Sequence, residues 1–280
     1  MSLTSQRIEE KSKSETFFAQ EVKSECESLL HMKKLTAIAF STVLYLREVF
    51  DESAYGERKH ENFVFRILSE RSDCKEATQI VRLIKGAFDA LEKKYLREII
   101  FGFYTDLKKP NDLIEAYSFK YSYNDGGKHF NLTFNNFELN SSSRKLSLNL
   151  QTEKSLKQLL TFARSLSSLP SECYLTMKLR YYDDVTPKEY EPPGFKSCVA
   201  ENFRINGKRL NVTTGLVETD FHSLQMKVNI DQTTIFPSKH QLESEEQSTT
   251  SESEQNNSKN FSPLKKMKST NEIKKEYNLN

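Results

Sequence analysis

The residue types that perform most enzyme chemistry occur in this chain, but their spacing does not predict a reactive site. The five histidines stand alone, without the HxxxH or HExxH spacing that places two imidazoles on one helix face for zinc. The four cysteines form no CxxC pair and predict no zinc site either. The sequence also has no glycine-rich phosphate loop and no GxSxG nucleophile elbow. The histidines are His31, His60, His129, His222 and His240, and the cysteines are Cys26, Cys74, Cys173 and Cys198.

One pair of acids, Asp183-Asp184, follows a predicted strand, which is a common place for catalytic carboxylates. An acid–base reaction would also need a nucleophile, a second base or a metal in the same site, and the sequence predicts none. The simpler interpretation is that the two acids solvate the start of a turn. We therefore expect a protein that is not an enzyme and that has no metal site and no cofactor.

The stretch Cys173–Phe195 has two halves with opposite physical properties. In the first half, apolar Leu175, Met177 and Leu179 alternate with polar residues, which predicts a strand with one buried face. In the second half, prolines at 187, 192 and 193 exclude both a helix and a central strand. A rigid strand is therefore followed by a stiff, extended segment that leaves the sheet. On physical grounds alone, an ordinary long loop would fit the prolines equally well.

The sequence MKLRYYDDVTPKEYEPPGF, from Met177 to Phe195, resembles the end of the core strand and the start of the safety belt in the HORMA domain. Two shorter matches are AYGER at Ala54–Arg58 and ALEKKYLRE at Ala90–Glu98. The resemblance is to the meiotic chromosome-axis branch of this family and spans about 24–236. It implies an α+β HORMA fold: three helices packed on a mostly antiparallel sheet, a C-terminal safety-belt segment, and a disordered tail.

The resemblance also implies a peptide-binding site and a set of partners. A partner peptide adds a strand to the sheet, and the belt passes over it. The implied partners are closure-motif peptides of axis proteins or of the chain's own tail, other HORMA proteins, an AAA+ remodelling ATPase and the chromatin- and cohesin-linked axis. The expected peptide-binding residues are Tyr174, Thr176, Lys178, Arg180 and Tyr182 of the core strand and Tyr190, Pro192, Pro193 and Phe195 of the belt.

Composition and periodicity divide the chain into three parts. Residues 1–22 are polar and charge-mixed, which predicts a flexible arm ending in a short docked piece; the resemblance makes this arm the handle for the ATPase. Residues 23–236 are the expected HORMA domain, with the belt at about 184–236. Residues 237–280 contain almost nothing to bury, which predicts a disordered tail.

Apolar residues at spacings of three and four predict three helices. The first follows a capping box at Ser24–Glu27, the second opens at Ser72-Asp73, and the third runs from about Thr152 to Ser167. Residues 51–61 are charged and predict a loop, followed by a short edge strand at 63–67. Further alternating runs predict strands at 99–104, 117–123, 130–134 and 221–230, the last of these being the final strand.

One island in the tail, Lys259–Lys268, combines apolar and basic residues. A closure motif is one interpretation, because Pro263 would pre-order an extended chain and the apolar side chains would fill pockets under a belt. A nuclear localisation signal at Lys265, Lys266 and Lys268 is the other, and both can hold. The residues of the predicted closure motif are Phe261, Ser262, Pro263, Leu264, Lys265, Lys266 and Met267.

Charge and hydropathy argue against some classes of function. The net charge is +2, from 41 basic and 39 acidic residues, so bulk charge does not favour nucleic acid. No apolar run approaches the length of about 18 residues that a membrane helix needs, and the N-terminus lacks the apolar core of a signal peptide. An intracellular chain with no membrane partner is expected, with reduced cysteines rather than two disulfides.

Two functions remain open. The resemblance implies a nuclear, meiotic chromosome-axis protein that captures closure-motif peptides and assembles along chromosomes, supporting homologue synapsis and recombination in the context of the synaptonemal complex. The alternative is direct binding of DNA or chromatin through the basic tail. The salt dependence of binding distinguishes the two functions, because electrostatic DNA binding weakens steeply with salt concentration and peptide capture does not.

Overall fold

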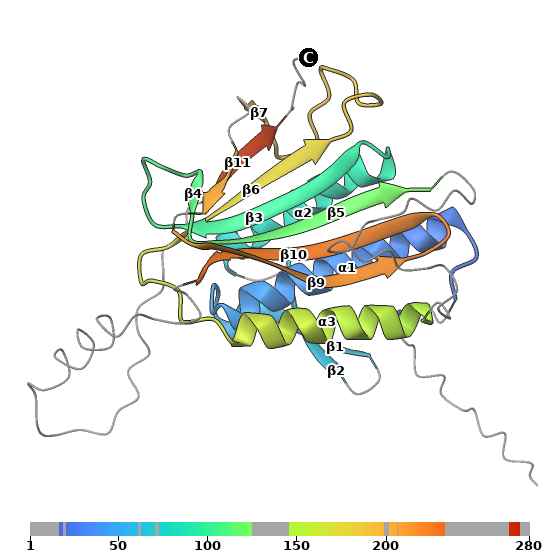
Figure 1. The fold of residues 1–280 in the computed structure, drawn as a ribbon, viewed down its shortest axis with the longest axis horizontal. Helices are drawn as coiled ribbons and strands as arrows, with labels where there is room; N and C mark the ends of the chain where they lie inside the picture. Colours follow the sequence, from blue (N-terminus) through green and yellow to red (C-terminus); the bar gives the residue numbers. More distant parts are fainter. Residues whose placement is uncertain are drawn as a thin grey trace, which may run out of the picture.

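The computed structural model describes residues 17–18, 21–60, 63–70, 73–124, 146–198, 202–205, 207–232 and 269–274, with residues 198 and 269–274 described by their backbone. A large sheet forms the centre of the molecule (Figure 1). In spatial order its strands are β7 (Ser197–Cys198), β11 (Ser269–Lys274), β6 (Tyr174–Tyr181), β3 (Leu96–Tyr104), β5 (Glu115–Tyr123), β10 (His222–Asp231) and β9 (Arg209–Glu218).

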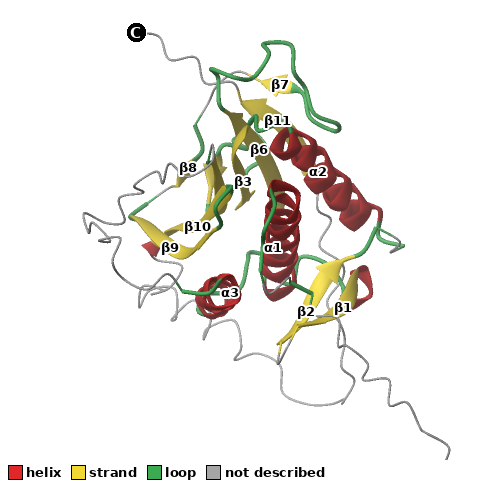
Figure 2. Cartoon of the chain, turned by 90° about the vertical axis from the view of Figure 1, so that its right-hand side faces the viewer, coloured by secondary structure: helices red, strands yellow, loops and turns green. Residues whose placement is uncertain are grey.

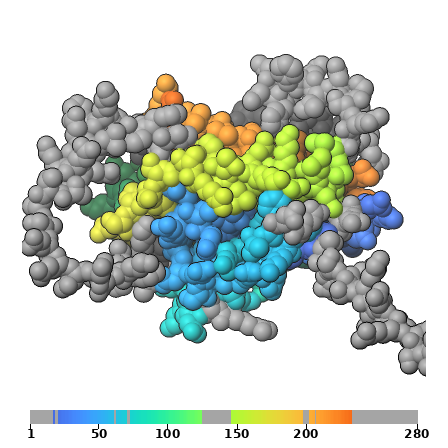
Figure 3. Space-filling view, turned by 90° about the horizontal axis from the view of Figure 1, so that it is seen from below, coloured from blue at the N-terminus to red at the C-terminus, as the bar shows by residue number. Residues whose placement is uncertain are grey.

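Helices cover one face and one edge of this sheet. The helices α1 (Glu25–Leu46) and α2 (Lys75–Glu92) lie against the same face, and α3 (Leu148–Arg164) runs along the edge formed by β9 (Figures 1 and 2). Seen from below, α3 lies across the molecule beside α1 (Figure 3). Two small sheets complete the fold, β1 (Tyr55–His60) with β2 (Phe63–Leu68) and β4 (Asp112–Leu113) with β8 (Arg204–Ile205). This is the predicted α+β arrangement.

Strand pairing in the large sheet is antiparallel except at one strand. The strands β6, β3, β5, β10 and β9 pair antiparallel with their neighbours. By contrast, β11 is parallel to both β6 and β7. Parallel neighbours cannot be joined by a tight hairpin. The strand β11 therefore cannot be joined to either neighbour by a tight hairpin; in the sequence it follows β10.

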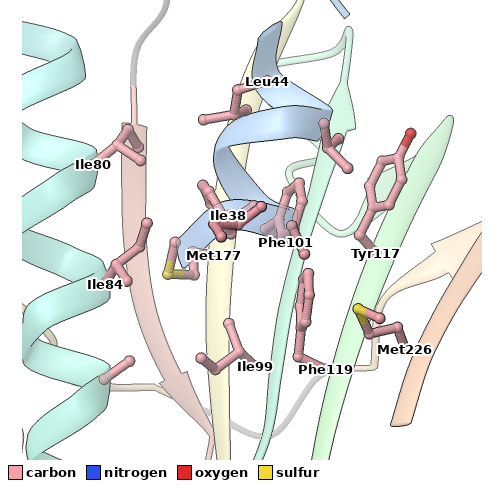
Figure 4. Packing of buried hydrophobic residues seen from close by; sticks show 14 of the residues in the cluster. Ile38, Leu44, Ile80, Ile84, Ile99, Phe101, Tyr117, Phe119, Met177 and Met226 are labelled. Carbon is pink, nitrogen blue, oxygen red and sulfur yellow. The ribbon is translucent and has the colours of Figure 1, made fainter. Parts of the chain in front are cut away.

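The core is the space between the helices and the sheet. Apolar side chains from α1 and α2 point toward those of the central strands, and most are fully removed from solvent (Figure 4). Burying each such side chain contributes about 1.5–3 kcal/mol. The labelled residues are Ile38 and Leu44 of α1, Ile80 and Ile84 of α2, and Ile99, Phe101, Tyr117, Phe119, Met177 and Met226 of the sheet.

The predicted helices are confirmed, with shifts at their ends. Ser24 caps α1, and its hydroxyl accepts a 3.2 Å hydrogen bond from the Glu27 amide. The second helix begins at Lys75, after Cys74. The third begins at Leu148 rather than at residue 152, because the Ser147 side chain accepts from the Leu150 amide and provides an earlier cap.

The loop predicted for residues 51–61 is wrong. Residues 55–60 are β1, which pairs antiparallel with β2 along its whole length. Only the ends of β1, Tyr55 and His60, are buried, while the charged residues between them lie on the surface. The Arg66 guanidinium of β2 pairs with the Glu57 carboxylate at 3.4 Å. A strand with a charged exposed face resembles a loop in composition, so composition was misleading here.

Much of the predicted arm and tail lies outside the described residues, as does the strand predicted at 130–134. The docked end of the arm is described: Phe18 is fully buried between the rings of His31 and His60, at 4.8 and 5.1 Å. The Lys34 ammonium donates to the Phe17 carbonyl at 2.9 Å. Among the helices that are described, none has the length and apolar character needed to cross a membrane.

Candidate functional site

The chain that leaves β6 passes around β11. After Tyr181 it reaches β7, which pairs with the outer edge of β11, and it then continues to β9 at the opposite edge of the sheet. On the way, β8 pairs with β4 on the face opposite to α1 and α2 (Figure 2). The strand β11 therefore lies between the core strand and the belt. This topology excludes the interpretation of the prolines as an ordinary surface loop.

The contact between β11 and its neighbours is a backbone ladder. Parallel pairing with β6 runs over six residue pairs, from Ser269–Leu175 to Lys274–Arg180. Two of these residues also pair with β7, as Ile273–Ser197 and Lys274–Cys198. At Ile273 and Lys274 the strand is flanked on both sides, which pairs backbone groups that an exposed sheet edge would leave open.

Within 237–280, the predicted tail, the structure describes one segment. That segment, 269–274, is a strand, and β10 is not the last strand of the chain. The segment STNEIK contains a single apolar residue, so no alternating pattern predicts it. The predicted closure motif at 261–267 and the predicted localisation signal end directly before this strand and lie outside the described residues.

The first half of the belt is attached to α2 through Tyr190. The Tyr190 hydroxyl donates a 2.5 Å hydrogen bond to Asp89 Oδ2, and its ring contacts Tyr95 and Tyr181 edge-on at 5.0 and 5.7 Å. Burial and the adjacent Asp89 carboxylate raise the pKa of Tyr190 above its ordinary value. Burial alone would raise the pKa of Asp89, but hydrogen bonds from Lys93 and Tyr190 lower it instead. Tyr190 thus holds the belt against the helix.

The Pro192–Phe195 segment lies against the same helix. A Cβ atom at Gly86 of α2 would stand 2.0 Å from the Pro193 carbonyl oxygen, so only glycine permits this approach. Phe195 is 4% exposed and belongs to the core, and Pro192 is buried while Pro193 is exposed. The φ of +85° at Gly194 gives the bend between them. The belt residues predicted to bind peptide, Tyr190 and the Pro192–Phe195 segment, therefore lie against α2.

The second half of the belt is attached to the polar side of β6. The Arg180 guanidinium pairs with Glu98 Oε2 at 3.0 Å and donates to Asn202 Oδ1 at 3.0 Å. The Lys178 ammonium lies 4.4 Å from the centroid of the Phe203 ring, a cation–π contact. Two alternate residues of the core strand thus hold two consecutive residues of the belt.

Lys178 has a further partner in the loop before β4, because its ammonium donates to the Asn111 side-chain oxygen. The side chain of Lys178 is almost fully buried, at 1% exposure. The belt residues Phe203 and Ile205 pack beside it against a small apolar cluster that includes Tyr104 and Leu113. Belt, loop and core strand are joined at this point.

The remaining predicted residues of the core strand have other contacts. The Tyr174 ring lies 5.4 Å from that of Tyr104. Thr176 is 1% exposed and lies in register with Thr270 of β11. The Tyr182 hydroxyl donates to the Tyr121 carbonyl at 2.8 Å. The backbone of β6 pairs with β11, while most of the named side chains contact the belt or the core; their binding of a partner peptide stays a prediction.

Sequence reasoning missed residues on both sides of the contacts that hold the belt. Asp89 and Gly86 lie on α2, and Asn111, Asn202 and Phe203 lie in segments that carry no recognisable pattern. Each is far along the chain from its partner; Asn111 and Lys178 are separated by 67 positions. A glycine within a helical pattern, as at Gly86, was an available signal of close backbone approach.

A buried serine–histidine pair was also missed. Ser28 Oγ of α1 lies 2.7 Å from His222 Nδ1 and 2.6 Å from Thr219 Oγ1. Burial lowers the pKa of His222. Such a pair could activate a nucleophile, but Ser28 has no exposed surface for a substrate to reach. It instead joins α1 to the β9–β10 turn. In the described part of the chain, no group of three or more His, Cys, Asp or Glu residues is arranged to hold a metal.

Comparison with known proteins agrees with this topology. The HORMA domain family model matches residues 28–222, more than half of the chain. HORMA domain-containing protein 2 of Bos taurus is 36% identical over 230 residues, covering 82% of this chain and 75% of that protein. HORMA domain-containing protein 1 of Xenopus laevis is 38% identical over 213 residues, covering 75% of this chain, which spans only 54% of that relative's length.

Solved structures show the same fold at lower identity. The structure of C. elegans HTP-2 bound to HTP-3 closure motif 1 has a TM-score of 0.67 at 22% identity, covering 76% of this chain and 90% of that one. C. elegans HTP-1 bound to the HIM-3 closure motif has a TM-score of 0.64 at 19% identity, covering 76% and 94%. With a family model over most of its domain and relatives above one-third identity, this chain belongs to the HORMA domain family.

Proposed function

We propose that this protein is a peptide-capture module, in which the belt holds an extended strand against β6, and that its own tail segment 269–274 occupies this place until a partner strand replaces it. The observation that carries the proposal is the parallel strand β11 between β6 and β7. An added strand at a sheet edge is a general mode of peptide recognition. In this interpretation the protein is a binding module and not an enzyme.

Topology makes such capture long-lived. Each backbone hydrogen bond contributes only about 0.5–1.5 kcal/mol net, so a strand of six residues would exchange readily at an open edge. Here, β7 and the belt enclose the strand on the side away from β6. Release therefore requires the belt to detach from Asp89, Lys178 and Arg180, which adds the strength of those contacts to the barrier.

The setting we propose is the meiotic chromosome axis in the nucleus. The support is the resemblance of the belt motif to that branch, the similarity to HORMA domain-containing proteins 1 and 2, and the fold shared with HTP-2 and HTP-1 bound to closure motifs. Capture of closure-motif strands from other axis proteins, including other HORMA proteins, would assemble the protein along chromosomes and support synapsis and recombination. An AAA+ ATPase that pulls on the N-terminal arm would reopen the belt.

Replacing the tail strand tests the proposal. Ile273→Pro in the full-length chain removes a backbone donor between β6 and β7 and should release the site. Binding of a fluorescent peptide of residues 259–280 is then measured by anisotropy. We expect the variant to bind at least tenfold faster than the unmodified chain, and the matched control Ile273→Val to behave like the unmodified chain. Equal binding rates for all three proteins would refute the proposal.

A further inference from the structure

The belt pairs with the captured strand through a short strand, β7. The strand β11 pairs with β6 along its whole length, from Ser269 to Lys274, but with β7 only at Ile273 and Lys274. In the part of the belt that the structure describes, β7 is the element that shares a backbone ladder with β11. The placement of β7 therefore decides whether the belt closes over the C-terminal end of the captured strand.

Two hydrogen bonds to one carboxylate close the loop that leads into β7. Glu191 Oε1 accepts from the Ser197 backbone amide at 2.8 Å and from the Ser197 hydroxyl at 2.7 Å. Inside this loop, the Phe195 amide donates to the Pro192 carbonyl at 3.1 Å, and Gly194 has a φ of +85°. Hydrogen bonds to a carboxylate are shorter and stronger than those between neutral groups. Ser197, the first residue of β7, is thus fixed relative to Glu191.

The core fixes the position of this loop, whereas β7 lies on the surface. Tyr190, the residue before Glu191, donates to Asp89 of α2, and Phe195 is buried in the core. Ser197 is exposed, so water competes for its amide and its hydroxyl. The two hydrogen bonds to Glu191 therefore connect an exposed strand to a segment that the core holds in place.

We propose that Glu191 is a positioning residue that places β7 against the captured strand, so that the belt grips the C-terminal end of that strand while β6 pairs with its whole length. This deepens the proposed function and rests on it. Loss of the Glu191 contact frees the C-terminal end first. The ligands that the belt retains longest are extended peptides that continue through the positions of Ile273 and Lys274, because a shorter strand does not reach β7.

Hydrogen exchange of the backbone amides of residues 269–274 in the full-length protein tests the proposal, because it reports local opening residue by residue. Glu191→Ala removes the acceptor of both hydrogen bonds. We expect protection at 273–274 to fall about fivefold or more, and protection at 269–272 to fall much less. Glu191→Gln keeps an acceptor oxygen and should retain most of the protection. The matched control Glu189→Ala removes another exposed acid of the belt and should leave protection unchanged.

A change at Ser197 shows whether Glu191 acts through this residue. Ser197→Ala removes the hydroxyl and keeps the amide, so a smaller loss of protection at 273–274 is expected, with no further loss in a Glu191→Ala background. Unchanged protection at 273–274 in Glu191→Ala, or an equal loss at every residue of 269–274, overturns the proposal. An absence of protection at 269–274 in the unmodified chain would remove the proposed function itself, so the two failures are distinct.

Discussion

The hydroxyl of Tyr190, in the belt, donates a 2.5 Å hydrogen bond to the carboxylate of Asp89 on α2. Lys93, one helical turn later, pairs with the same carboxylate at 2.7 Å and lies 4.9 Å from the centre of the Tyr190 ring. These three residues connect a helix of the core with the segment that encloses β11. The belt is therefore held by a specific polar contact in addition to apolar packing.

Tyr190→Phe tests this contact. The variant keeps the ring and loses the hydroxyl. Because the hydrogen bond is to a charged acceptor on a half-exposed surface, we expect the attachment of the belt to α2 to be weakened by about 1 kcal/mol. Exchange of the tail for a labelled 259–280 peptide should become about fivefold faster, measured by stopped-flow anisotropy. In an Asp89→Ala background the same substitution should have no effect. An equal acceleration in both backgrounds would show that the hydroxyl acts elsewhere.

Gly86→Ala tests the approach of the belt to α2. Alanine within a helix ordinarily stabilises it by up to about 1 kcal/mol relative to glycine. Here the new Cβ would lie 2.0 Å from the Pro193 carbonyl oxygen, so the belt or the helix must shift. We expect a lower free energy of unfolding in urea and faster peptide exchange. Gly56→Ala is the matched control, because its Cβ would meet nothing closer than the Ile67 carbonyl oxygen at 3.9 Å.

Glu115→Ala tests the buried ion pair that joins α1 to the sheet. The Arg47 guanidinium pairs with Glu115 Oε2 at 3.0 Å and donates to the Ser167 carbonyl at 2.6 Å, and both side chains are almost fully buried. Removing one partner leaves a buried charge, so the free energy of unfolding should fall by about 3–5 kcal/mol in urea. Lys157→Ala removes an exposed pair with Glu153 and should cost about 0.5 kcal/mol or less. Similar losses in the two variants would contradict this assignment.

Stability should depend on pH through His31. Burial, with smaller contributions from Lys34 and His60, lowers its pKa from 6.5 to about 4. The unfolded chain therefore binds a proton between these values that the folded chain does not. The contribution of His31 to the free energy of unfolding, about 3 kcal/mol, is fully present above pH 6.5 and is lost as the pH falls toward 4.

The substitution His31→Gln isolates this contribution. Glutamine can still hydrogen-bond to Thr152, which now lies 2.9 Å from His31 Nε2, but it does not titrate. Urea unfolding at pH 7.5 and pH 5 should show a smaller loss of stability in the variant than in the unmodified chain. An identical loss in both proteins would place the pH dependence on other groups, such as His222, whose pKa burial also lowers.

Local patterns in the sequence determined the helices, the central strands and the start of the belt. The stripe of apolar residues in α1 and the alternation in β6 report burial on one face, and each can be recognised within a few turns or residues. The prolines at 187, 192 and 193 restrict the backbone wherever they occur, so an extended segment after β6 was predictable. The family resemblance identified that segment as a safety belt.

The tertiary structure alone decided what the belt holds and what holds the belt. The strand β11 exists because the edges of β6 and β7 offer backbone partners, and a polar hexapeptide such as STNEIK has no pattern of its own that reveals this. The contacts of Lys178 likewise come from Asn111 and Phe203, which lie in distant parts of the chain. Hydrogen bonds and charges act through space, whereas sequence periodicity reports only which face of one element is buried.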